Sequence, residues 1–168
     1  MMTMSKTIDD LKDAFAGESQ ANRKYLAFAA KADAEGFPQA ARLFRAAAEA
    51  ETIHAHAHLR AMKGIGSTKD NLREAVAGET HEFTKMYPEM IEHAKAEGQK
   101  DAERSFNYAN EVEKVHARLY QQMLEAGDVA ADAYAYYVCP VCGFTAEKDA
   151  PETCPVCGTK GKMFKKVD

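Results

Sequence analysis

The sequence predicts a mainly α-helical protein that ends in a small, cysteine-rich β module. Three observations support this prediction: long segments rich in Ala, Leu, Glu, Lys and Arg, an internal repeat within them, and four Cys that all follow residue 138. With 168 residues, the chain is long enough for one domain with a hydrophobic core and a small appendage.

Four segments are expected to be helices, because Gly-rich and Pro-containing breaks separate them. They span residues 5–34, 38–63, 69–97 and 100–126. Pro38 suits the first position of the second helix, and Thr68 is the expected N-cap of the third. Residues 134–138 favour a strand. The predicted domains are residues 1–130 and 134–168.

The charge balance argues against a polyanion as the partner. The chain has 22 Lys and Arg against 26 Asp and Glu, a net charge of −4, whereas a nucleic-acid binder needs clustered basic charge. The first 20 residues include charged side chains and no apolar run, so neither a signal peptide nor a membrane span is expected. We therefore expect a cytoplasmic protein without nucleic-acid or membrane partners, in which two CxxC pairs favour a metal over disulfides.

An internal repeat divides the helical region into two copies of one helix hairpin. Residues 14–18 recur as residues 75–79 at an offset of 61, and residues 49–55 recur as residues 111–117 at an offset of 62. Between them, Ala34-Glu35-Gly36 matches Ala96-Glu97-Gly98. Each copy therefore supplies the same residue types at matching places.

The two copies bring acidic and imidazole side chains together. Residues three apart share a helix face, so the Glu and the His of each Glu-x-x-His motif lie side by side. Each copy adds a Glu that follows a helical Gly, Gly17 or Gly78, which costs a helix about 1 kcal/mol and suggests close packing there. The six candidate ligands are Glu18, Glu51, His54, Glu79, Glu113 and His116.

This ligand set is that of ferritin-like di-iron four-helix bundles, in which two helices supply one Glu each and two supply Glu-x-x-His. A single Glu-x-x-His in a chain with 29% charged residues is more often a solvated helix face. Two at one repeat position, with two matching Glu, favour a metal site. Four buried carboxylates repel one another unless dications compensate, and carboxylate with imidazole suits iron or manganese.

Three further residues have two interpretations each. Glu82 lies one turn after Glu79, and its repeat partner is Ala21. It is therefore either a seventh ligand on one metal only or a surface carboxyl. Tyr25 and Tyr87 lie two turns beyond the Glu that follows each helical Gly, and they are either core aromatics or neighbours of the ligands.

Two histidines near His54 are weaker candidates. His58 lies one turn further along and could compete with His54, although Leu59 and Met62 nearby favour a packing role. His56 is expected to point away from His54. The sequence leaves the roles of His56 and His58 open.

The C-terminal module contains two copies of Cys-Pro-Val-Cys-Gly, with 11 residues between them. In each copy Gly permits a tight turn, and backbone N–H groups can point at the sulfurs. Four thiolates bind either zinc or a single iron, and the segment alone does not decide between them. The candidate ligands are Cys139, Cys142, Cys154 and Cys157.

Together these features resemble the rubrerythrin family, a ferritin-like di-iron domain followed by a rubredoxin-like one-iron domain. The resemblance covers residues 11–164 and is carried by both cysteine knuckles, both Glu-x-x-His motifs and the segments at 16–19, 78–83 and 86–88. It implies iron in the cysteine site and hydrogen bonds from Tyr25 and Tyr87 to ligand carboxylates. It also implies that His54 binds the first iron in the ferrous state and that Glu82 replaces it in the ferric state.

The expected function is therefore reduction of hydrogen peroxide to water by a non-haem di-iron peroxidase. Glu51 and Glu113 would bridge the metals, and Glu18 and Glu79 would be terminal ligands. Electrons would enter through the iron of the four-cysteine site from a rubredoxin or an NAD(P)H-dependent reductase. A ferroxidase or oxygen-reducing protein would use the same ligands, and a non-catalytic metal-binding protein with a zinc clip is a different class.

The connection between the second and third helices is short. In ferritin-like bundles these helices run parallel, so the chain must return along a helix of about 38 Å. Residues 64–68 can span only about 20 Å. Either the bundle is a simple up-down-up-down one, or each hairpin pairs with the other hairpin of a second chain. The resemblance favours the domain-swapped homodimer.

Overall fold

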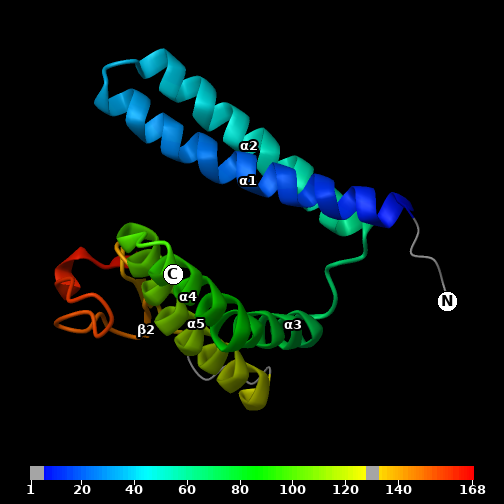
Figure 1. Cartoon of the computed structure of the whole chain (residues 1–168). Coiled ribbons are helices and arrows are strands. Elements are labelled where there is room, and N and C mark those ends of the chain that lie inside the picture. The colour runs from blue at the N-terminus through cyan, green and yellow to red at the C-terminus, as the bar shows by residue number, and fades with distance from the viewer. Residues whose placement is uncertain (1–5, 128–132) are drawn as a thin grey trace. The chain divides into compact units, whose positions relative to one another are not determined.

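The computed structural model describes residues 6–127 and 133–168, which are mainly helical and end in a small sheet (Figure 1). Its elements are α1 (Lys6–Ala34), α2 (Pro38–Ala61), α3 (Thr68–His81), the π-helical turn η1 (Glu82–Met86), α4 (Tyr87–Ala96), α5 (Lys100–Ala126), β1 (Tyr136–Val138), β2 (Thr145–Glu147), the 3₁₀ turn η2 (Gly161–Met163) and β3 (Lys165–Val167). Two compact units divide the chain, Met1–Gly66 and Ser67–Asp168. The predicted domain boundary at 130–134 falls largely outside the described residues and stays a prediction.

The first unit is the antiparallel hairpin of α1 and α2, seen in blue and cyan in Figure 1. Its turn places Gly36 at a φ of +79°, where a residue with a Cβ would be strained, and the Phe37 N–H donates to the Ala32 carbonyl at 2.8 Å. Small side chains line the seam between the helices, and Ala41 and Ala48 are almost completely buried. The two backbones therefore approach closely along their length.

The second unit begins with a helix cap that differs from the predicted one. Ser67, and not Thr68, is the N-cap of α3, because its hydroxyl oxygen accepts from the Asp70 N–H at 3.2 Å. The hydroxyl also donates to the Asp70 carboxylate at 2.6 Å. Asp70 lies three residues after Ser67, where its N–H and its carboxylate both reach the Ser67 hydroxyl, whereas Asn71 occupies that position relative to Thr68.

The predicted third helix is interrupted, and this corrects the expectation of one continuous helix over 69–97. A π-helical turn separates α3 from α4, with the Tyr87 N–H donating to the Glu82 carbonyl. Pro88 follows at the start of α4 and cannot donate a hydrogen bond to the preceding turn, so the regular helical ladder is already broken there. The repeat locates the cause, because three residues, 22–24, correspond to four, 83–86. One inserted residue is accommodated as the wide turn.

The cysteine-bearing residues form a three-stranded antiparallel sheet in the order β2-β1-β3. Each knuckle is closed by a backbone hydrogen bond of 3.0 Å, from Gly143 to the Cys139 carbonyl and from Gly158 to the Cys154 carbonyl. Gly143 has a φ of +85°, and a Cβ on it would lie 3.8 Å from the Val112 side chain. The first knuckle therefore rests on α5 within the second unit.

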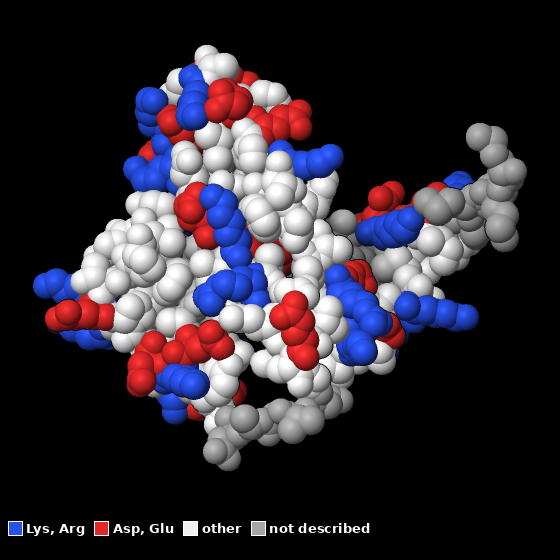
Figure 2. Space-filling view, turned by 90° about the horizontal axis from the view of Figure 1, so that it is seen from below, with Lys and Arg blue, Asp and Glu red and all other residues white. Residues whose placement is uncertain are grey.

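The described surface is mixed in charge. Figure 2 shows Lys and Arg interspersed with Asp and Glu over the face that it presents. Many of these charges pair one turn apart on a helix, as Lys95 does with Glu92 at 2.8 Å and Arg104 with Asp101 at 2.8 Å. Among the described residues, no helix is long and apolar enough to cross a membrane.

Candidate metal centres

The α1–α2 hairpin gathers three of the predicted ligands. Oxygen or nitrogen atoms of Glu18, Glu51 and His54 lie within 4.8 Å of one another. The His54 Nδ1 atom is 2.9 Å from the Glu51 carboxylate and 4.0 Å from the Glu18 carboxylate. The His54 side chain is 55% exposed, so this group lies open on its hairpin.

The second hairpin gathers the matching three residues from α3 and α5. The His116 Nδ1 atom is 2.8 Å from the Glu113 carboxylate and 4.0 Å from that of Glu79. All three are half-buried, and the His116 side chain is only 27% exposed. The sequence repeat is therefore reproduced as two groups with nearly the same distances and different exposure.

The carboxylates of the second group have raised pKa values. Burial and the neighbouring Glu113 carboxylate raise the pKa of Glu79 to about 7, and burial also raises the pKa of Glu113. A cation placed between these oxygens would remove the repulsion and favour both charged forms. The donor set therefore fits a divalent metal ion bound by two carboxylates and one imidazole.

Glu82 lies near the second group but is not part of its ligand cluster. Its charge contributes to the raised pKa of Glu79 and of Glu113, which places its carboxylate on the same side of the hairpin. Glu82 also occupies the first position of η1. Because π-helical turns inside helices frequently mark functional sites, this position suits a carboxylate that changes partners.

The two predicted tyrosines occupy matching places in the two hairpins. Tyr87 packs against Phe106 with ring centroids 6.3 Å apart, and Tyr25 packs against Phe44 at 6.1 Å. Burial and then the Glu82 carboxylate raise the pKa of Tyr87, so its hydroxyl keeps its proton beside the acidic group. Both tyrosines are half-buried within their hairpins.

The histidines near His54 lie outside the ligand groups of the described residues. His56 is exposed and lines a shallow groove with Ser19 and Asn22, and His58 is half-buried. Within their own units Gly17 and Gly78 are not closely packed, because no described atom beyond their own helix lies within 4 Å of a Cβ built on either, and the expectation of close packing there stays a prediction. Both glycines face outward within their own units.

The four cysteines form one compact group. Sulfur atoms of Cys139 and Cys157 are 3.5 Å apart, as are those of Cys142 and Cys154, and all four are free thiols. Burial opposes ionisation of Cys139, but the N–H groups of Cys142 and Val141 outweigh it and lower the pKa of that thiol to about 6. Burial raises the pKa of Cys142 and of Cys154. A tetrahedrally coordinated cation is what would favour four thiolates here.

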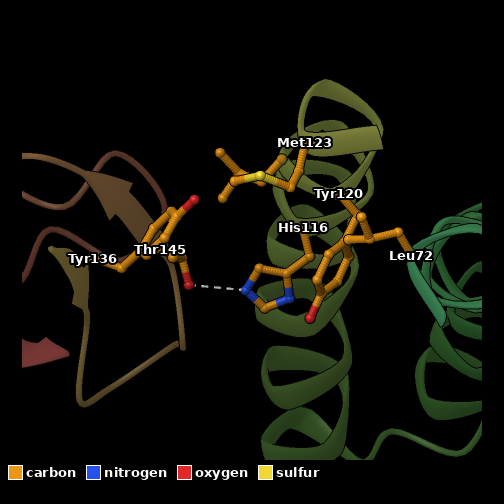
Figure 3. Close-up of a pocket in the computed structure, with 7 residues that line it drawn as sticks. Leu72, His116, Tyr120, Met123, Tyr136 and Thr145 are labelled. Atoms are coloured by element: carbon orange, nitrogen blue, oxygen red, sulfur yellow. Dashed lines mark hydrogen bonds between the residues drawn. The ribbon is translucent and has the colours of Figure 1, made fainter. Parts of the chain in front are cut away.

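Two further residues near His116 are not among those expected from the sequence. The Thr145 hydroxyl of β2 lies 3.0 Å from His116 Nε2, and Tyr120 lies one turn beyond His116 on α5. Both line a cavity of about 250 Å³, and Figure 3 shows the His116 ring directed at Thr145. Burial, then Glu79 and Glu113, raise the pKa of Tyr120. Helical spacing from His116 could have indicated Tyr120, but no sequence pattern links residue 145 to residue 116.

Comparison with known proteins finds matches over both the helical region and the cysteine module. Residues 9–124 match the rubrerythrin family, and residues 137–165 match the rubredoxin-like domain of rubrerythrin. Rubrerythrin-2 of Clostridium acetobutylicum is 39% identical over 94% of this chain and 95% of its own. Nigerythrin of Nitratidesulfovibrio vulgaris is 36% identical over 84% of this chain and 76% of its own. The structure of fully reduced, all-ferrous nigerythrin matches 99% of this chain and 89% of its own with a TM-score of 0.59 at 33% identity.

Proposed function

The chain belongs to the rubrerythrin family, whose members bind a di-iron centre and a rubredoxin-like iron, and we propose that it is a peroxidase that reduces hydrogen peroxide to water. The observation that carries the proposal is the pair of matching Glu, Glu and His groups in the same chain as a group of four cysteines. The paired groups suit two metals that act together, and the cysteine group suits a one-electron supply.

The reaction needs two electrons and two protons for each peroxide, and it yields two water molecules. When bound, two ferrous ions can supply both electrons together, so that no radical product is released. We propose that Glu18, Glu51 and His54 would hold one metal and that Glu79, Glu113 and His116 would hold the other. The carboxylates then provide the negative charge that holds the two dications close together.

Glu82 and His54 are proposed as alternative ligands that would hold one of the metals in its different charge states. An anionic carboxylate stabilises a higher metal charge, whereas a neutral imidazole suits a lower one. The electrostatic influence of Glu82 on Glu79 and Glu113 supports this proposal for Glu82. The phenols of Tyr25 and Tyr87 would donate hydrogen bonds to ligand carboxylates and orient them.

We propose that the two groups of ligands meet in a domain-swapped homodimer. Helix α2 has 24 residues, a length of about 36 Å, whereas the six residues from 62 to 67 can span only about 20 Å. The chain therefore cannot return along α2 before α3 begins. Each di-iron site would take one ligand group from the α1–α2 hairpin of one protomer and the other from the α3–α5 hairpin of its partner.

The four-cysteine group is proposed to receive electrons one at a time from a rubredoxin or an NAD(P)H-dependent reductase. Iron in four thiolates changes its charge by one unit, whereas zinc does not change its charge and would make the module a structural clip. The close sulfur atoms and their partly unfavourable ionisation suit either metal. Metal analysis and the visible spectrum distinguish them, because ferric thiolates are coloured and zinc thiolates are not.

The function is tested by mixing the fully reduced, iron-loaded protein with peroxide or with oxygen under otherwise anaerobic conditions. We expect peroxide to oxidise the di-iron centre at least about 10-fold faster than oxygen, a difference of about 1.4 kcal/mol in the barrier. Faster oxidation by oxygen would support an oxygen-reducing protein or ferroxidase instead. Cys154→Ser is the matched variant, and we expect it to keep the single oxidation and to lose repeated turnover with an external donor.

A further inference from the structure

We propose that Thr145 is a positioning residue that fixes the ring of His116 for metal binding. The inference rests on the proposed function in one respect, namely that His116 is a metal ligand. Thr145 belongs to β2 of the cysteine module, and His116 belongs to α5. Their side chains meet within the second unit, as Figure 3 shows.

The hydrogen bonds of Thr145 match the His116 tautomer that metal binding through Nδ1 requires. A threonine hydroxyl has one proton to donate, and Thr145 Oγ1 donates it to the Gly143 carbonyl at 3.2 Å. The same oxygen therefore accepts from His116 Nε2 at 3.0 Å. A neutral imidazole protonated at Nε2 has its lone pair on Nδ1. In His116 that nitrogen is the one 2.8 Å from the Glu113 carboxylate.

In this tautomer, two acceptors face each other across 2.8 Å. The Nδ1 lone pair of neutral His116 and a carboxylate oxygen of Glu113 both need a positive partner between them or beside them. A metal ion bound by both atoms provides that partner, and the Thr145 hydrogen bond keeps the ring in the tautomer that can bind it. In the metal-bound state, Thr145 would thus hold the Nε2–H end of the ring while Nδ1 binds the metal.

The acceptor is itself attached to rigid backbone. Gly143 has a φ of +85° and closes the first knuckle through its 3.0 Å hydrogen bond to the Cys139 carbonyl. It also lies against Val112, the buried residue that precedes Glu113 on α5. The chain of contacts from Gly143 through Thr145 to His116 therefore begins and ends beside the same turn of α5. A fixed acceptor restricts rotation of the His116 ring more than water would.

His54 has no such support among the residues that the structure describes. Its Nδ1 atom lies 2.9 Å from Glu51, but its Nε2 atom has no hydrogen-bond partner there. Its side chain is 55% exposed against 27% for His116. A ligand held at one end can rotate away, whereas a ligand held at both ends cannot without breaking the second bond. Within the described units, His116 therefore has hydrogen-bond partners at both ring nitrogens, whereas His54 has one at Nδ1.

The test compares Thr145→Val, which removes the hydroxyl at constant shape, with Thr145→Ser, which retains it. Thr153→Val is the control, since Thr153 is an exposed residue of the same module. In the full chain, ferrous affinity of the di-iron site is measured by chelator competition, and histidine ¹⁵N spectra are recorded with zinc(II) as the diamagnetic probe. We expect Thr145→Val to weaken ferrous binding by about 10- to 100-fold and to alter the His116 ring signals alone. Thr145→Ser and Thr153→Val are expected to resemble the parent.

The inference is overturned if Thr145→Val retains both the parent affinity and the parent His116 signals. It is also overturned if Thr145→Ser is as impaired as Thr145→Val, because loss of packing would then explain the effect. The absorbance of iron in the four-cysteine site reports whether the module of each variant is folded. None of these measurements uses peroxide, so a parent protein that fails to reduce peroxide would refute the proposed function and leave this test intact.

Discussion

The two hairpins carry the same ligand pattern but support it differently. Each brings one Glu and one Glu-x-x-His motif together, with His Nδ1 2.8–2.9 Å from the nearer carboxylate. In the second hairpin a π-helical turn starts at Glu82, and Thr145 contacts His116 from the cysteine module. In the first hairpin α1 is continuous, Ala21 stands in place of Glu82, and His54 is exposed. A duplicated framework can thus give two metals unequal surroundings through a few added contacts.

The two hairpins can be tested separately if those of one di-iron site come from different chains, because each variant chain then supplies one intact hairpin. Refolding Glu51→Ala chains together with Glu113→Ala chains is then expected to restore about a quarter of the di-iron sites. Mixed dimers would combine both damaged hairpins in one site and both intact hairpins in the other. The measurement is di-iron content and peroxide activity of the mixture, with each variant refolded alone as the control. Recovery of no activity would show that each chain closes its own bundle.

The additional carboxylate of the second hairpin provides the next test. We expect Glu82→Gln to slow oxidation of the reduced protein by peroxide about 10- to 100-fold, because the neutral amide stabilises the higher metal charge less well. Iron content is expected to stay at the parent level, since Glu82 lies outside the ligand cluster. Stopped-flow absorbance measures the rate, and Glu89→Gln on the exposed side of α4 is the matched control. A parent rate in Glu82→Gln would exclude the proposed ligand exchange.

Removing the inserted residue would make the second hairpin resemble the first. Deleting Thr84 from η1 shortens the spacing from Glu79 to the tyrosine at 87 so that it equals the spacing from Glu18 to Tyr25. We expect a continuous helix, retained iron binding and a peroxide rate as low as that of Glu82→Gln, because only the Glu82 carboxylate is displaced. Circular dichroism, metal analysis and stopped-flow absorbance check these outcomes. A parent rate would mean that the π-helical turn does not position Glu82.

The smallest expected effect is a pH dependence of stability in the metal-free chain. The pKa of Glu79 is raised to about 7 from an ordinary value of 4.5. Between these values the folded chain keeps a proton that the unfolded chain has released, so the free energy of unfolding falls as pH rises. Urea unfolding at about pH 5 and about pH 7.5 measures this fall. We expect Glu79→Gln to reduce this fall in the free energy of unfolding and Glu89→Gln to leave it unchanged. An equal fall in the parent and in Glu79→Gln would contradict a raised pKa of Glu79 beside Glu113.

The sequence predicts local features of the fold better than their interruptions. Periodicity and the glycine-containing breaks locate the helices to within a few residues, because helix ends depend on nearby residues. The choice of Ser67 over Thr68 as N-cap was also encoded locally, in Asp70 three residues after Ser67. The π-helical turn was missed although the repeat offset rises from 61 to 62 across it. An inserted residue is visible only when the two copies are aligned position by position.

The candidate sites, too, can be predicted from the sequence only where local spacing places the residues. Glu18, Glu51 and His54 come together because helical spacing and one hairpin turn place them, and both are readable from sequence. The contact between His116 and Thr145 joins residues 29 positions apart in different elements. It depends on how the cysteine module packs on α5, which no local pattern encodes. Sequence therefore identifies the candidate ligands, while the residues that hold them in place require the structure.

The α1–α2 hairpin is joined at one end by the tight turn at Gly36, so a small change in the angle between its helices displaces residues far from the turn. Glu51 lies 15 residues beyond that turn, a distance of about 22 Å along the helix. A change of about 2° in the crossing angle would move its carboxylate by about 0.8 Å, more than the tolerance of about 0.5 Å for a working site. The buried Ala41 and Ala48 oppose such a tilt because their methyl groups leave no space to close. Substitutions along this seam are therefore expected to misplace the Glu51 carboxylate although every candidate ligand is kept.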